Sequence, residues 1–137
     1  MMTDMDYSQE RRFVESFIVK NRSERLLYQL TTPEKRCEGV SRVCHWAKDL
    51  LDPNRIIMEG EDLERRPEFE NFVKAHDEMC LVLSPDFYVD EQFLPLNDAV
   101  KQAVLSFDAV LILGNGFAVV FGEVMKGGRG KYLLSEK

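Results

Sequence analysis

Two uninterrupted apolar runs near the end of the chain constrain its fold most. Ala109–Leu113 and Phe117–Phe121 contain only apolar residues, and Gly114-Asn115-Gly116 separates them. Asn-Gly is the strongest short-range signal for a β-hairpin, because both residues tolerate positive φ. The pattern therefore predicts a hairpin. Strands without polar alternation are buried on both faces, so we expect other elements to cover this hairpin from each side.

The first half of the chain has the apolar spacing of amphipathic helices. One stripe combines residues three and four apart: Phe13, Val14, Phe17 and Ile18. We expect a break at Asn21–Ser23, with Ser23 as a cap. Thr32-Pro33-Glu34 is typical of a helix start, and Asp52-Pro53-Asn54 of a helix end.

Further helices are expected from Pro67 onward and over Pro95–Phe107. Short strands are expected at Arg55–Met58, Met79–Leu83 and Lys131–Leu134. The expected fold class is therefore α+β, or else α/β. In it, N-terminal helices pack on a small mixed sheet that ends in a C-terminal β-hairpin. A chain of 137 residues is expected to form a single globular domain, 1–137.

The acidic residues are concentrated in the middle of the chain. The whole chain has 24 acids, 18 Lys and Arg, and a net charge of −6. Residues 61–108 hold 12 of the acids and only 4 of the bases. Nucleic-acid binding needs a basic face, so this distribution argues against it. It suits the steering of a basic protein partner.

Two acidic turns follow the first two expected strands. The predicted binding residues lie in them: Glu59, Glu61, Asp62, Asp86, Phe87, Tyr88, Asp90 and Glu91. Loops at strand ends often carry function, and aromatic anchors inside a charged rim suit a protein-binding surface. The ordinary alternative is that both turns are only solvated loops. Oxygen ligands would suit Mg²⁺ or Ca²⁺, but the calcium-hand spacing is absent, so no metal is predicted.

No catalytic motif emerges from the cysteines and histidines. Cys37 and Cys44 share an apolar helical stripe and are predicted to be buried, inert thiols. Adjacent residues on a helix point about 100° apart, which argues against a pair between Cys44 and His45. His76, Asp77 and Cys80 would have to converge on one short loop. Zinc is not predicted, because no closely spaced ligand pairs occur.

The glycines near the C-terminus invite a phosphate-binding interpretation. Lys126, Arg129 and Lys131 surround Gly127, Gly128 and Gly130. The P-loop spacing fails, because Met125 and Tyr132 stand where glycine and Ser or Thr are required. A tight turn is therefore the preferred interpretation, and no cofactor is predicted.

The resulting hypothesis is a non-enzymatic, cytoplasmic protein-binding module. Its most concrete form is an immunity or antitoxin-type inhibitor of a basic protein. The acidic start, Met1–Asp6, does not resemble a secretory segment, and no apolar run approaches the ~20 residues of a membrane span. Two alternatives stay open. One is a small-molecule or nucleotide-handling enzyme that uses the strand-end acids and the Gly/Lys/Arg loop. The other is a structural homodimer subunit that pairs through the apolar hairpin.

Overall fold

The computed structural model describes residues 6–86, 88–124 and 128–136. The helices within these ranges are α1 (Ser8–Phe17), α2 (Lys20–Leu30), α3 (Arg36–His45), α4 (Ala47–Leu50), α5 (Pro67–Ala75) and α6 (Leu96–Leu105). The strands are β1 (Ile56–Glu59), β2 (Met79–Leu83), β3 (Gln92–Pro95), β4 (Val110–Leu113), β5 (Phe117–Phe121) and β6 (Lys131–Ser135). Short 3₁₀ turns at Pro33–Lys35, Pro53–Arg55 and Leu63–Arg65 link some of them.

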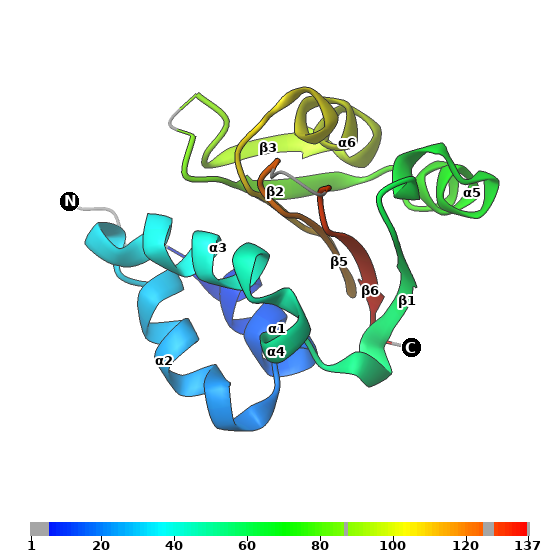
Figure 1. Ribbon diagram of the computed structural model, residues 1–137. Coiled ribbons are helices and arrows are strands. Elements are labelled where there is room, and N and C mark those ends of the chain that lie inside the picture. Colours follow the sequence, from blue (N-terminus) through cyan, green and yellow to red (C-terminus); the bar gives the residue numbers. More distant parts are fainter. Residues whose placement is uncertain (1–5, 87, 125–127, 137) are drawn as a thin grey trace.

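Among the described residues, the strands form one sheet in the order β1-β6-β5-β4-β2-β3 (Figure 1). Every strand pair in that sheet is antiparallel. The predicted α+β class is therefore confirmed, but the sheet is antiparallel rather than mixed. Three strands, β6, β5 and β4, lie between β1 and β2. Because each neighbouring pair is antiparallel, β1 and β2 run in the same direction.

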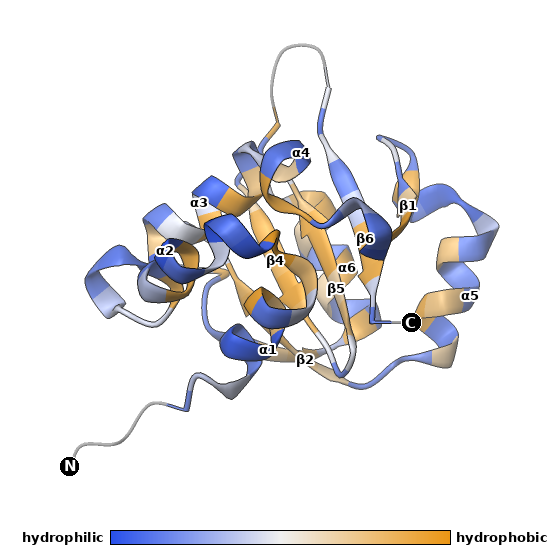
Figure 2. Cartoon of the chain, turned by 90° about the horizontal axis from the view of Figure 1, so that it is seen from below, coloured by the Kyte–Doolittle hydropathy of each residue, from blue (hydrophilic) through white to orange (hydrophobic). Residues whose placement is uncertain are grey.

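Helices cover both faces of the sheet (Figure 1). On one face α1–α4 pack against side chains that include Leu111 and Val120. On the other face α5 and α6 pack against the alternate side chains, including Ile112 and Val119. The central strands β2, β4 and β5 are apolar throughout, and the helices carry polar residues as well as apolar ones (Figure 2). The apolar hairpin runs are thus buried from both sides, as their lack of alternation predicts.

The predicted β4–β5 hairpin is present. Leu113 pairs with Ala118, and the Gly114 N–H donates to the Phe117 carbonyl at 3.0 Å. Gly116 has a φ of +84°, but Asn115 does not have a positive φ, so the turn needs the left-handed conformation only at its second position. The hairpin has neighbours β2 and β6 on its outer sides, so it offers no free edge for a homodimer.

The break between the first two helices falls at Ile18–Val19 rather than at Asn21–Ser23. Tertiary pairing decides this position, because Val19 N–H donates to the Leu50 carbonyl at 2.8 Å and Ile18 bridges to Leu51. Ser23 lies inside α2, where its hydroxyl donates to the Lys20 carbonyl at 2.7 Å. It therefore does not cap the helix as expected.

The edge strand β3 has no counterpart among the predicted strands. It lies in a segment without clear periodicity, and it pairs along β2 from Val82↔Gln92 to Met79↔Pro95. An edge strand has a hydrogen-bonding partner on one side only. Proline, which has no N–H to donate, is therefore tolerated at the end of this strand. Its pairing with β2 turns the chain back so that α6 starts next to the end of α5.

Candidate functional site

The acidic segment of the sequence is divided in space between two edges of the sheet. One acidic turn follows β1, and the other connects β2 to β3. Four strand spacings separate β1 from β2, which is roughly 19 Å at ~4.8 Å each. The eight predicted binding residues therefore belong to two surfaces rather than to one.

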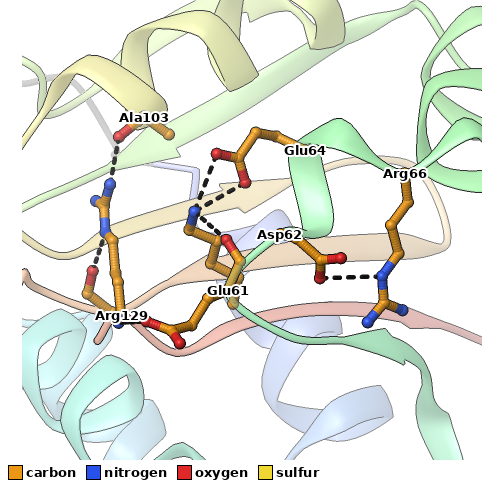
Figure 3. A network of polar contacts seen from close by, with 8 residues as sticks. Glu61, Asp62, Glu64, Arg66, Ala103 and Arg129 are labelled. Atoms are coloured by element: carbon orange, nitrogen blue, oxygen red, sulfur yellow. Dashed lines mark hydrogen bonds and ion pairs between the residues drawn. The ribbon is translucent and has the colours of Figure 1, made fainter. Parts of the chain in front are cut away.

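The turn after β1 is bound to the chain's own cations (Figure 3). The Glu59 carbonyl accepts from Arg66 Nη2 at 2.9 Å, and Asp62 Oδ1 accepts from Arg66 Nε at 3.2 Å. Glu61 Oε1 accepts the backbone N–H of Arg129 at 3.2 Å. These acids hold the turn against its neighbours.

Lys131 lies beneath the same turn. Its ammonium group donates to the Glu61 carbonyl at 2.6 Å and to both oxygens of Glu64, at 2.8 and 3.0 Å. Burial alone would raise the pKa of Glu64, but the hydrogen bond and charge of Lys131 outweigh it and lower that pKa. Lys131 is therefore committed to internal contacts.

The Arg129 side chain points toward α6, where the Ala103 carbonyl accepts from it (Figure 3). Its guanidinium donates to the Gly122 carbonyl, to the Ala103 carbonyl at 2.9 Å and to the Asp108 carbonyl at 2.9 Å. Burial lowers its pKa. Two of the three cations in the considered phosphate loop thus serve the fold, and Lys126, like Met125 and Gly127, lies outside the described residues.

The second acidic turn, Ser84–Glu91, is braced by its own side chains. Asp86 Oδ1 accepts the Tyr88 N–H at 3.0 Å, and Asp90 Oδ1 accepts the Ser84 N–H at 3.0 Å. The Ser84 hydroxyl donates to the Ala109 carbonyl at 2.6 Å. Tyr88 is 83% exposed on this braced turn. Phe87 lies outside the described residues.

A buried arginine attaches this turn to the helical layer. Arg36 Nη2 is 3.4 Å from Glu91 Oε1 and 3.7 Å from Asp90 Oδ1, while Nη1 is 3.3 Å from Glu10 Oε2. Arg36 and Glu10 are both buried. Burial raises the pKa of the Glu10 carboxyl.

Sequence reasoning missed both Arg36 and Glu10. Each is a charged residue at an inward position of an apolar helical stripe: Glu10 stands three residues before Phe13, and Arg36 four before Val40. A charged residue at an inward helical position was the sequence signal that could have identified both residues. A charge at such a position requires a partner, since an unpaired buried charge is costly.

The cysteine predictions are partly wrong. Cys44 is buried over β4, with its thiol 3.9 Å from the Val110 carbonyl, and burial raises its pKa to about 12. Cys37 is exposed, because Arg36 takes the inward position in the first turn of α3. Burial likewise raises the pKa of Cys80 to about 12. Neither of the two buried thiols has the lowered pKa of a nucleophile.

The considered His76, Asp77 and Cys80 trio does not assemble. The His76 ring stacks on Phe72, with centroids 4.0 Å apart. Asp77 Oδ1 instead accepts the Asn97 N–H at 3.1 Å, and the Cys80 thiol faces the Glu78 carbonyl at 3.4 Å. His45 similarly turns to Glu123, at 3.3 Å, rather than to Cys44.

Within the described ranges, no cluster of three or more His, Cys, Asp or Glu side chains is placed to hold a metal ion. Across the same residues, no helix is both long and apolar enough to cross a membrane. No protein-family model, curated protein or solved structure matches this chain.

Proposed function

We propose that this protein is a non-enzymatic binding module that presents the Ser84–Glu91 turn to a basic protein partner. One observation carries the proposal: Tyr88 is 83% exposed on a braced turn whose other side chains include Asp86, Asp90 and Glu91. A large aromatic side chain with an acidic surround has the composition of an interface anchor and its rim.

The internal hydrogen bonds of the turn support this function. Asp86 accepts the Tyr88 N–H and Asp90 accepts the Ser84 N–H, so both carboxylates brace described parts of the turn before any partner arrives. A preorganised loop loses less conformational entropy on binding than a mobile loop does. The surrounding carboxylates accelerate encounter with a basic surface. An immunity or antitoxin-type inhibitor of a basic protein is the most concrete form, acting in the cytoplasm, where thiols stay reduced.

The test begins with capture of partners from the source cells by the purified protein, followed by identification with mass spectrometry. Association and dissociation rates of the captured partner are then measured for Tyr88→Ala and for the triple variant Asp86→Asn/Asp90→Asn/Glu91→Gln. Asparagine and glutamine retain the acceptor oxygens that hold the turn, whereas lysine would break those bonds and repel Arg36. A second triple variant, Glu15→Gln/Glu24→Gln/Asp49→Asn, removes the same charge from the exposed side of the helical layer.

The neutralised turn should slow association with a basic partner and flatten the salt dependence of that rate. Tyr88→Ala should mainly speed dissociation, because a packed anchor sets the lifetime of a complex. The control triple variant should leave both rates close to those of the parent protein. Equal rates for the parent, the neutralised turn and Tyr88→Ala would show that this turn is not the binding surface.

A further inference from the structure

A groove of about 630 Å³ separates α5 from α6 on the face of the sheet opposite α1–α4. The two helices that flank it are seen on one side of the sheet in Figure 1. Apolar side chains from both helices line it: Phe69, Val73, Val100, Val104 and Leu105. Its volume lies within the ~300–1,000 Å³ typical of sites that bind small molecules.

The groove has a polar end. Asp77 Oδ1 accepts the Asn97 N–H at 3.1 Å, which joins the end of α5 to the start of α6. Lys74 stands one turn before Asp77, and Lys101 stands one turn after Asn97. Both lysines line the groove, one on each wall, at the level next to this joined end.

The other end is apolar and open. Val104 lies about one turn of α6 beyond Lys101, and Leu105 follows it. Val104 is 39% exposed and Leu105 is 81% exposed. Exposed apolar residues that continue into an apolar groove are typical of a ligand-binding surface. The groove therefore runs from an end that holds Lys74 and Lys101 beside the Asp77 carboxylate to a more apolar mouth at Val104 and Leu105.

The three acids that line the groove differ in their partners and in their position along it. Glu64 is paired with Lys131 at 2.8 Å, and Asp77 is engaged by the Asn97 amide. Glu70 stands one turn from Lys74 in the direction of the apolar mouth. Within the described part of the chain, the side chains of Lys74 and Lys101 have neither a hydrogen bond nor an ion pair, so both ammonium groups are available to an anion.

We propose that this groove binds an amphipathic organic anion with an unbranched apolar chain and one anionic head group. The chain lies on Val73, Val100 and Val104, and the head group lies between Lys74 and Lys101. This site is separate from the Ser84–Glu91 turn and does not depend on its proposed role. Apolar contact supplies most of the affinity, and the two lysines orient the ligand.

Decanoate, used below its micelle concentration, is the probe. Amide chemical shifts of the full chain are followed by NMR as decanoate is added, and decyltrimethylammonium serves as the cation with the same chain length. We expect saturable binding of one decanoate, with shift changes confined to residues 64–77 and 97–107. The cation should bind about tenfold more weakly, since its head group meets two lysines.

Two variants and one control variant locate the ligand. Lys74→Met/Lys101→Met keeps the apolar stems and should weaken decanoate about tenfold while changing the affinity for the cation little. Lys20→Met/Lys48→Met removes the same charge from the helical layer and should leave the affinity for decanoate unchanged. Val104→Trp should fill the groove and abolish binding of both probes.

Three results would overturn the proposal. One is binding without saturation, or with shift changes spread over α1–α4. Another is equal or tighter binding of decyltrimethylammonium, which would assign the head-group site to Glu70 and Asp77. The third is full retention of decanoate affinity by Lys74→Met/Lys101→Met in a variant whose spectrum shows an intact fold.

Discussion

Arg36 and Glu10 form a buried ion pair, with Arg36 Nη1 3.3 Å from Glu10 Oε2, that joins α3 to α1. The Nη2 atom of Arg36 faces the carboxylates of Asp90 and Glu91. A single arginine therefore connects two helices to the turn that carries Tyr88. Glu10 Oε1 and Arg36 Nη2 are both buried without a hydrogen-bond partner among the described residues, so Nη2 meets Asp90 and Glu91 through charge attraction rather than through a hydrogen bond.

Removal of the arginine should destabilise the fold more than removal of its buried acid does. Arg36→Met leaves Glu10 buried without a cation, which typically costs about 3–5 kcal/mol. Glu10→Gln should cost less, because Arg36 still faces Asp90 and Glu91. The free energy of unfolding is measured by urea denaturation, with Arg65→Met as an exposed control. A loss for Arg36→Met that is no larger than that of the control would disprove the role of the pair.

The same cluster predicts a pH dependence of stability. Burial raises the pKa of Glu10 above its ordinary value of 4.5, so the folded state binds this proton more tightly than the unfolded state does. The resulting stabilisation is complete below 4.5 and is lost as the pH rises through the folded-state pKa. The stability of the parent relative to Glu10→Gln should therefore fall as the pH rises from 4.5 toward neutrality. A constant or rising difference across that interval, measured by urea denaturation, would contradict the assignment.

The β4–β5 turn predicts two different glycine effects. Gly116 has a φ of +84°, and a Cβ there would make only ordinary contacts with Arg12 and Glu136, so Gly116→Val should cost about 1–3 kcal/mol, mainly through backbone strain. A Cβ on Gly114 would instead overlap the Phe117 ring, so even Gly114→Ala should destabilise the protein. Asn115→Ala is the control, since it removes only a side-chain contact to Arg12. Thermal melts of the three variants test whether both glycine variants are less stable than the Asn115→Ala control. A melt of Gly116→Val equal to that of the parent would refute the strained turn.

The three cysteines should differ sharply in their reactivity. Cys37 is exposed and should react quickly with a thiol reagent in the native protein. Cys44 and Cys80 are buried with pKa values raised to about 12, so they should react only after unfolding. Mass spectrometry of peptides after timed labelling measures each rate. Fast native labelling of Cys44 would reopen the interpretation of Cys44 and His45 as a catalytic pair.

The sequence by itself determined the elements whose signals are local. The apolar runs around Gly114-Asn115-Gly116 predicted β4 and β5, and the predicted strand Met79–Leu83 has the same bounds as β2. Pro67 begins α5 as expected. These features depend on side-chain periodicity and turn chemistry over a few residues, so they are readable without knowledge of the fold.

The tertiary structure alone decided the features that depend on partners far along the chain. The edge strand β3 is a strand because β2 lies beside it. The break between α1 and α2 falls at Ile18–Val19 because the Leu50 carbonyl accepts the Val19 N–H. The acids of residues 61–108 are close together in the sequence, which by itself predicts one acidic surface. Sheet order instead places β1 and β2 four strands apart, so these charges belong to two edges.

The sites were decided in the same way. Lys74 and Lys101 line one groove because β3 returns the chain so that α6 starts where α5 ends. Arg36 meets Asp90 and Glu91 because the β2–β3 turn folds over the start of α3. Local sequence specifies which face of an element is apolar, but the positions of charged groups relative to one another follow from strand order and chain reversal, which are set only when the whole core packs.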